Sequence, residues 1–313
     1  MKTGKRTSPA ACVLVTGAPR SGTTVVGELL SAAPGAIELY EPMSDIVGDT
    51  AVPSWFPIPG EEGFDEATAD DLVARIVRRR LRCGWRPEAI QGTQGRNRFL
   101  NRTRRTAMLA RLQPWKPTQV WKDPMALMLA PRLARAGKIP VIITVRDPLS
   151  LASSYKRMDW RPPVEGLVER MQRAGMEIDQ RIPDLVKGDL DPMRAGAIAW
   201  NLFYRMLLGE MRAGLPATVI RNADLMTHPE KVRQRLIAVT GLAVPEPEEA
   251  AEDSGDTSAD LPQKAHIANR SLESVTQYWR KTLSEEEVAF GRLLNDDLWA
   301  ELEQEIERHR ESW

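Results

Sequence analysis

The sequence contains little cysteine and little histidine, and it has no long apolar run. Cys12 and Cys83 are the only cysteines among 313 residues, and there are three histidines. Two cysteines cannot build a disulfide framework or a cysteine-rich zinc cluster, so we expect a reducing compartment and no metal site. No stretch approaches the roughly 20 apolar residues of a membrane-spanning helix, and the short apolar stretch near the N-terminus is too short for a signal peptide. These absences predict a cytoplasmic protein with no membrane partner.

A net charge is also absent. Lys+Arg and Asp+Glu both number 43, which gives a formal net charge of +0. A dedicated nucleic-acid binder is usually basic overall, so we expect no nucleic-acid partner. A hydrophobic content of 42% with 27% charged residues is ordinary for a globular protein. The length fits one large domain, and we expect residues 1–313 to form it.

Short apolar strand patterns alternate with helical patterns along the chain. The strand patterns cover residues 12–17, 37–40, 118–121, 141–145 and 217–220. Between and after them, helical patterns cover residues 22–33, 66–82, 101–112, 125–136, 149–158, 193–213 and 229–240. Ser284 and Glu287 have the spacing of a capping box that opens a final helix. The alternation predicts an α/β fold with a central parallel sheet that is covered on both faces.

The segment Gly17–Thr24, with the sequence GAPRSGTT, joins the first strand to a helix. In that position, backbone N–H groups and a helix N-terminus converge on an anion. Gly17 and Gly22 have the spacing of the nucleotide P-loop G-x-x-x-x-G-K-[ST], but Thr23 stands where that loop has lysine. Arg20 supplies the cation instead. The loop therefore favours binding of a 5′-phosphate over phosphoryl transfer from Mg-ATP.

A second anion site is predicted after the strand at residues 141–145. Arg146 follows this strand directly, and Ser154 lies eight residues further on. Ligands of open parallel sheets bind outside the carboxyl ends of the strands, and a guanidinium with a hydroxyl suits a phosphate. Asp147, just before Pro148, is interpreted as a helix cap rather than a metal ligand.

These two sites resemble those of the PAPS-dependent sulfotransferases, where PAPS is 3′-phosphoadenosine 5′-phosphosulfate. Pro19–Thr24 matches the P-[RK]-S-G-T-T loop that holds the 5′-phosphosulfate, and Arg146 with Ser154 matches the 3′-phosphate site. Residues 39–42 (LYEP), 121–124 (WKDP) and 221–225 (RNADL) are similar to the bacterial and glycan-type branch of the family. The resemblance spans about residues 12–290. It implies a P-loop-like three-layer sandwich, PAPS as the donor and 3′,5′-bisphosphoadenosine (PAP) as the product.

The resemblance also implies roles for individual residues. The cofactor-binding residues would be Pro19, Arg20, Ser21, Gly22, Thr23, Thr24, Arg146 and Ser154, with Arg270 and Ser271 from a loosely matching C-terminal loop. The reaction hypothesis is in-line transfer of a sulfuryl group to an acceptor hydroxyl, which needs cations at the developing charge and a base for the hydroxyl proton. Arg20 and Lys122 are the candidate cations. Glu41 is the candidate base, since it matches the acid that the glycan-type branch uses, and His266 is the alternative.

Residues 43–115 are predicted to form a largely helical acceptor-binding insertion. Trp55, Phe56 and Trp85 are candidates for stacking on a flat ring or a sugar face. An acidic acceptor would be attracted by Arg96, Arg98, Arg102, Arg104 and Arg105. The alternative is an arginine-rich helix face in contact with solvent, because Arg75, Arg78, Arg79 and Arg82 have helical spacing. On the branch resemblance, a carbohydrate hydroxyl is favoured over a small natural-product alcohol.

The C-terminal part has two predicted segments. Residues 245–264 form an acidic flexible segment, because residues 245–260 hold seven acids and no base. Residues 265–313 would contain the cofactor-closing loop and a helix. Two alternatives to the sulfotransferase hypothesis remain at this point: a P-loop-type kinase or nucleotide hydrolase, and a non-catalytic nucleotide-binding module. The sequence leaves the acceptor and the oligomeric state open, and a homo-oligomer is compatible with it.

Overall fold

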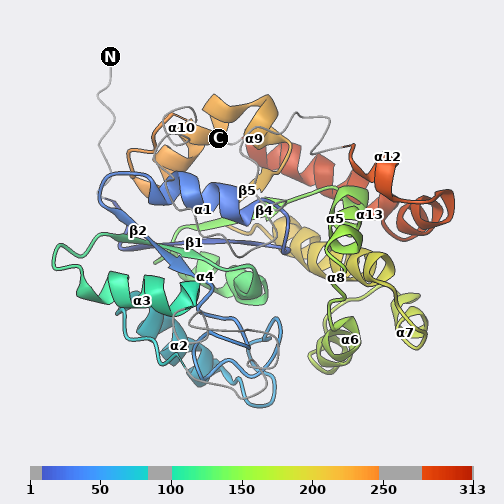
Figure 1. Cartoon of the computed structure of the whole chain (residues 1–313), viewed down its shortest axis with the longest axis horizontal. Helices are drawn as coiled ribbons and strands as arrows, with labels where there is room; N and C mark the ends of the chain where they lie inside the picture. Colours follow the sequence, from blue (N-terminus) through green and yellow to red (C-terminus); the bar gives the residue numbers. More distant parts are fainter. Residues whose placement is uncertain (1–8, 84–100, 247–276, 312–313) are drawn as a thin grey trace.

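Five parallel strands form the centre of the computed structural model, which describes residues 9–83, 101–246 and 277–311 (Figure 1). The strands lie in the order β2-β3-β1-β4-β5. Their bounds are β1 Cys12–Gly17, β2 Ala36–Tyr40, β3 Thr118–Lys122, β4 Val141–Val145 and β5 Thr218–Arg221. The predicted α/β fold with a parallel sheet is confirmed.

The inner strands are buried along their whole length. Every residue of β1, β3 and β4 is buried, as expected when both faces of a parallel sheet are covered. Successive side chains point to opposite faces, so Leu14 packs into one hydrophobic cluster and its neighbours Val13 and Val15 pack into another.

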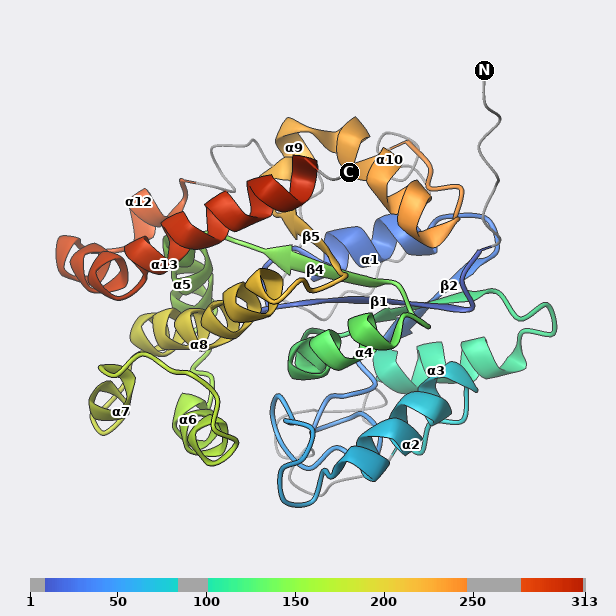
Figure 2. The ribbon, with the colours of Figure 1, turned by 180° about the vertical axis from the view of Figure 1, so that it is seen from behind.

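Helices cover the two faces and make a three-layer arrangement (Figures 1 and 2). One face carries α1 (Thr23–Ser31) and α10 (Pro229–Thr240), whose apolar residues join Val13 and Val15. The larger cluster on the other face includes residues from α2 (Glu66–Val77), α4 (Ala130–Ala136), α5 (Pro148–Arg157), α6 (Val164–Arg173) and α8 (Pro192–Arg212). The remaining helical elements are α3 (Arg102–Leu112), η3 (Pro124–Leu129), α7 (Ile182–Leu185), α9 (Asp224–Thr227), α12 (Trp279–Thr282) and α13 (Glu285–Glu311). Among the helices in the described residues, none has the length and apolar character needed to cross a membrane.

Two predicted helices differ from their observed bounds. The helix predicted at 66–82 ends at Val77, because Arg79 adopts a left-handed backbone conformation with φ 60°. The side chain of Arg79 donates hydrogen bonds to the carbonyls of Ala110 and Pro117. The segment predicted as a helix at 125–136 begins as the 3₁₀ element η3 and becomes α-helical only at Ala130.

The alternative in which Arg75, Arg78, Arg79 and Arg82 form one solvated helix face is wrong, since α2 ends at Val77. Arg75 is buried, and its guanidinium bonds to the fully buried carboxylate of Asp49 at 2.8 Å. The sequence spacing could not show this, because Asp49 lies in the loop before the helix. Arg102 on α3 is likewise paired with Glu38 at 3.0 Å and Glu28 at 3.7 Å.

The prediction that Trp55 and Phe56 stack on an acceptor is also wrong. Trp55 is 8% exposed and Phe56 is fully buried. The ring of Phe56 packs 4.3 Å from that of Phe203 on α8, measured between centroids. The loop that follows β2 therefore contributes aromatic side chains to the main hydrophobic core, where they are unavailable to a ligand. Trp85, Arg96 and Arg98 lie outside the described residues.

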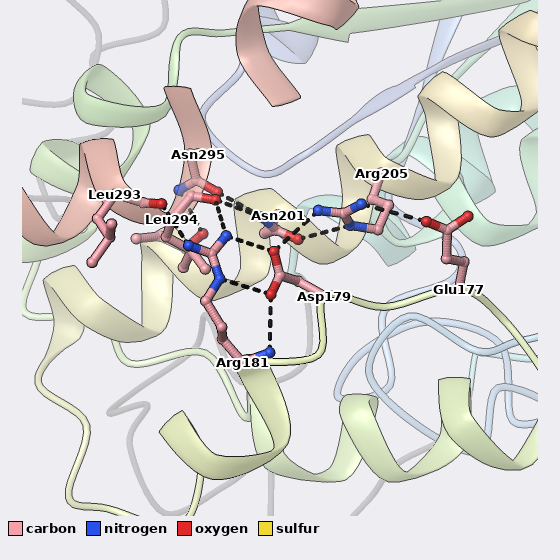
Figure 3. Close-up of polar contacts among 9 residues, drawn as sticks. Glu177, Asp179, Arg181, Asn201, Arg205, Leu293, Leu294 and Asn295 are labelled. Carbon is pink, nitrogen blue, oxygen red and sulfur yellow. Dashed lines mark hydrogen bonds and ion pairs between the residues drawn. The ribbon is translucent and has the colours of Figure 1, made fainter. Parts of the chain in front are cut away.

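The last described helix, α13, packs on α5 and α8, and a buried polar network joins it to α8 (Figure 3). The predicted capping box at its start is confirmed, since Ser284 and Glu287 exchange N–H hydrogen bonds of 2.7 and 3.2 Å. Further along, the buried amide of Asn201 donates to Asn295 at 3.0 Å, and Asn295 donates to the Ala197 carbonyl at 3.1 Å. The network satisfies polar groups that the contact between the two helices removes from water.

Replacing Asn295 with alanine should lower the free energy of unfolding by about 1–3 kcal/mol, because it leaves buried groups on α8 without their partner. Urea unfolding of the full chain measures the change. Glu301→Gln is the control, because its ion pair with Arg212 is half exposed and should contribute less than about 1 kcal/mol. Equal effects of the two substitutions would show that the buried network does not hold α13 in place.

Candidate active site

The candidate site residues lie at one edge of the sheet, where the parallel strands end. Pro19–Thr24 follows β1, Glu41 follows β2, Lys122 is the last residue of β3, and Arg146 follows β4. The strand register places Lys122 opposite both Val15 and Tyr40. The carboxyl edge of a parallel sheet is where such folds bind their ligands. The fold therefore brings four separate segments of the sequence prediction to one place.

The loop after β1 fits closely against β4 and the residue after β5. Gly17 has φ 146°, and a Cβ atom there would lie 2.3 Å from the carbonyl oxygen of Thr144. Gly22 has φ 109°, and a Cβ atom there would lie 2.5 Å from the amide nitrogen of Asn222. The Ser21 hydroxyl bonds to that of Thr144 at 2.6 Å. Both glycines are thus required by conformation and by space.

The two predicted anion sites are in direct contact. Arg20 Nε donates to the Ser154 hydroxyl at 3.2 Å, and Arg146 Nη1 donates to the Arg20 carbonyl at 3.1 Å. Asp147 caps α5 by accepting from the Ser150 N–H at 2.8 Å, as predicted. The loop after β1, the end of β4 and the helix that carries Ser154 therefore form one continuous basic site.

Aromatic residues of α5 and α8 support this site from behind. The Tyr155 hydroxyl donates to the Pro19 carbonyl at 3.3 Å, and Trp200 Nε1 donates to the Arg146 carbonyl at 2.7 Å. The Tyr204 hydroxyl donates to the Thr144 carbonyl at 3.3 Å. Burial raises the pKa of Tyr155 well above its ordinary value, so its hydroxyl keeps its proton and remains a donor. Our sequence reasoning missed these residues, because a buried helical aromatic gives no signal beyond its hydrophobicity.

Glu41 and Lys122 form an ion pair beside the basic site. Lys122 Nζ lies 2.6 Å from Glu41 Oε1 and 4.2 Å from the centre of the Tyr40 ring. The lysine side chain is only 3% exposed, whereas that of Glu41 is 21% exposed. At Gly27 on α1, a Cβ atom would lie 2.9 Å from Lys122 Cγ, so this glycine lets α1 approach the lysine stem. The pair combines a buried cation with a carboxylate that solvent can reach.

Arg20 and Glu41 share an unusual backbone conformation. Their φ angles are 73° and 43°, in the left-handed region that non-glycine residues rarely adopt. Such a conformation costs about 1–3 kcal/mol and persists only where neighbouring groups hold it. Two of the charged residues predicted from the sequence are therefore held in strained positions at the same edge of the sheet.

A buried carboxylate, Asp123, lies next to this pair. Its Oδ2 atom accepts from the Met43 N–H at 2.6 Å and from Trp121 Nε1 at 3.2 Å, and Oδ1 accepts from the Met125 N–H at 3.0 Å. Burial and the Glu41 carboxylate raise the pKa of Asp123 to about 7, although the N–H donors and Lys122 act in the opposite direction. Asp123 was part of a matching segment in the sequence, but it was not singled out as a site residue.

Three sequence-predicted residues, His266, Arg270 and Ser271, lie outside the described residues. The site at the sheet edge consists of the loop after β1, the ends of β2, β3 and β4, the first turn of α1, and Ser154 on α5.

Comparisons with known proteins bear on the identity of the chain. The sequence model of the sulfotransferase family matches residues 12–246. Among solved structures, the chain is similar to the sulfotransferase domain of the Synechococcus PCC 7002 olefin synthase, with 14% identity and a TM-score of 0.44. This similarity covers 91% of the present chain and 94% of the other. A search of the curated proteins finds no match. Because the family match covers well over half of its residues, the chain belongs to the sulfotransferase family, a family of enzymes.

Proposed function

We propose that the protein transfers the sulfuryl group of PAPS to a hydroxyl group of a carbohydrate or a small natural product. The observation that carries this proposal is the contact of Arg20 with Ser154 and of Arg146 with the Arg20 carbonyl. These contacts join two anion sites at the edge of the sheet that also holds Glu41 and Lys122. The edge therefore holds groups suited to the two phosphates of a nucleotide, together with a carboxylate suited to act as a base.

The residues present fit PAPS as the donor. Gly17 and Gly22 let the loop pack against Thr144 and Asn222, where a Cβ atom would clash, and they give it the turn that a phosphate-binding loop needs. The first N–H groups of α1, from Thr23 and Thr24, have no acceptor within the helix, so they are suited to bind a 5′-phosphate. Ser21 uses its hydroxyl on Thr144 and its N–H on the Ala18 carbonyl, so its proposed role is to shape the loop. When bound, PAPS supplies the sulfuryl group, and PAP is the product.

Arg20, Arg146 and Ser154 would hold the two phosphates. The guanidinium groups would neutralise phosphate charge, and Arg20 is proposed to stabilise charge on the leaving oxygen as well. Arg146 and Ser154 provide the 3′-phosphate subsite. This assignment follows the residue types and their spacing, and it is supported by the contact of both residues with Arg20.

Glu41 is proposed as the base that takes the proton of the acceptor hydroxyl. Lys122 orients its carboxylate and supplies a second positive charge for the transferring group. The buried position of Lys122 strengthens its field, because little water screens it. His266 remains the alternative base, but no contact in the described residues bears on it.

The acceptor class rests on the resemblance to the glycan-type branch. Arg102 is neutralised by Glu38 and Glu28, so it adds little attraction for an acidic acceptor. Residues 43–115 remain the proposed acceptor-binding segment and residues 265–313 the proposed cofactor-closing segment. A screen with PAPS over sugars, phenols and aliphatic alcohols, read out as sulfated product, identifies the acceptor.

Glu41→Gln should lower kcat by about 10²–10⁴-fold, because the amide cannot accept the hydroxyl proton. The affinity for PAP should stay the same, since Glu41 is not assigned to the nucleotide. Sulfate transfer and PAP titration calorimetry measure the two quantities. Glu38→Gln, on the strand that precedes Glu41, is the matched control, and it should leave kcat nearly unchanged. An unaltered kcat in Glu41→Gln would remove Glu41 from the role of base.

Arg146→Ala and Ser154→Ala should each weaken binding of PAP more than binding of adenosine 5′-phosphate, which lacks the 3′-phosphate. A lost charge-assisted hydrogen bond of about 1.5–3 kcal/mol corresponds to roughly a 10- to 100-fold loss for PAP in Arg146→Ala. Arg161→Ala, which removes an exposed arginine that pairs with Glu165, is the control. Equal losses for both nucleotides would argue against a 3′-phosphate subsite.

The alternatives make different predictions in the same binding assays. A kinase or nucleotide hydrolase would bind Mg-ATP tightly and PAP poorly, and this result would contradict the proposal. A non-catalytic nucleotide-binding module would bind PAP but would show no acceptor-dependent release of PAP from PAPS with any acceptor in the screen.

A further inference from the structure

We infer that Asp123 is a positioning residue that holds the Glu41 segment in its strained conformation and thereby sets the place of the Glu41 carboxylate. The inference rests on the proposed role of Glu41 as the base. The juxtaposition that supports it is between the end of β3 and the three residues after β2.

Two consecutive residues at the end of β3 bind the main chain on both sides of Pro42. The Glu41 N–H donates to the Lys122 carbonyl at 2.8 Å, and the Met43 N–H donates to Asp123 Oδ2 at 2.6 Å. Pro42 has no N–H group of its own. Both N–H groups available in the segment 41–43 are thus bonded to the end of β3. One of these bonds is to a side chain, so it depends on the identity of residue 123.

The conformation of Glu41 needs such external support. Its φ of 43° lies in the left-handed region, which is unfavourable for a residue with a Cβ atom. Glu41 also precedes a proline, and a residue in that position strongly prefers extended conformations. The Glu41 carbonyl also accepts from the Ser44 N–H at 3.1 Å, and the Pro42 carbonyl accepts from the Asp49 N–H at 2.8 Å, but both donors lie in the same loop. The bonds to Lys122 and Asp123 tie the segment to the sheet. Without the bond to Met43, we therefore expect the segment to relax toward an extended backbone and the Glu41 carboxylate to move away from Lys122.

Asp123 is itself firmly placed. It is fully buried, its own N–H donates to the Val15 carbonyl at 2.9 Å, and Trp121 Nε1 and the Met125 N–H donate to its carboxylate. Within the described residues, its two oxygens accept three hydrogen bonds, and all three donors are N–H groups. Asparagine has nearly the same shape but only one acceptor oxygen. It would therefore present an NH₂ group to one of the N–H groups that the carboxylate now accepts from.

The first test compares Asp123→Asn with Trp121→Phe in the full chain. Asp123→Asn should lower kcat on the order of 10- to 100-fold, as expected when a reacting group is misplaced, while the affinity for PAP stays the same. Trp121→Phe removes a donor from the same carboxylate and leaves a cavity in the core, but it spares the bond to Met43. It should lower Tm with little change in kcat. Similar kcat losses in both variants would mean that kcat follows stability alone, and the inference would be overturned.

The second test is a double-mutant cycle with Glu41→Gln. If Asp123 acts through Glu41, adding Asp123→Asn to Glu41→Gln should cause no further loss of kcat. Losses that multiply would show that Asp123 acts independently of Glu41, which contradicts the inference. If Glu41→Gln alone leaves kcat unchanged, the part of the proposed function that assigns the role of base to Glu41 is wrong. If Glu41→Gln lowers kcat and Asp123→Asn does not, only the present inference fails.

A third variant covers the case in which Asp123→Asn does not fold. Replacing Met43 with its α-hydroxy acid analogue changes one backbone amide to an ester and deletes the N–H from which Asp123 accepts, while every side chain stays in place. The ester variant should show the same selective loss of kcat with unchanged PAP affinity. An ester variant with the kcat of the unmodified protein would overturn the inference.

Discussion

The hydrogen bond from Arg146 to the Arg20 carbonyl is the contact on which the rest of the site depends. It joins the loop after β1 to the end of β4, and it brings two cations together that repel each other. The fold allows this closeness because the Arg146 donor meets a carbonyl oxygen and Arg20 Nε meets the Ser154 hydroxyl. A basic site prepared in this way is suited to an anionic ligand with two charged ends.

The site is rigid because buried groups fix its backbone. Tyr155 and Trp200 donate to carbonyls of the loop and of Arg146, and Asp123 accepts from the segment that carries Glu41. These supporting residues belong to the hydrophobic core or to buried strand ends, where their bonds are little weakened by water. The strain at Arg20 and Glu41 is thus offset by many ordinary contacts nearby. Groups placed in advance do not have to be reorganised during a reaction, which is how an enzyme stabilises developing charge.

The last described helix supports the same site from a distance. The match to the family ends at residue 246, yet α13 packs on α5, which carries Ser154, and on α8, which carries Trp200. Figure 3 shows Asn201 of α8 bonded to Asn295 of α13, and Arg181 donating to the carbonyls of Leu293 and Leu294 on α13. Asp179 accepts from both Arg181 and Arg205, and so links Arg205 of α8 to this contact. A change in the position of α13 would therefore alter the position of α5, which carries Ser154 of the proposed 3′-phosphate subsite.

Sequence alone was sufficient for features whose cause is local. The strands, the glycine loop, the cap of α5 by Asp147 and the capping box at Ser284 depend on periodicity and on hydrogen bonds between residues close in the chain. The family resemblance also indicated Arg20, Glu41, Lys122, Arg146 and Ser154, and the parallel sheet brings them to one edge because its strands all end there. Only the tertiary structure decided which partners meet across long separations. The Glu41–Lys122 pair, the burial of Trp55, Phe56 and Arg75, and the contact of Asp123 with Met43 all join segments that no local pattern connects. Such contacts depend on the register and packing of whole strands and helices, and these are set by the sum of all core contacts rather than by the residues of any one segment.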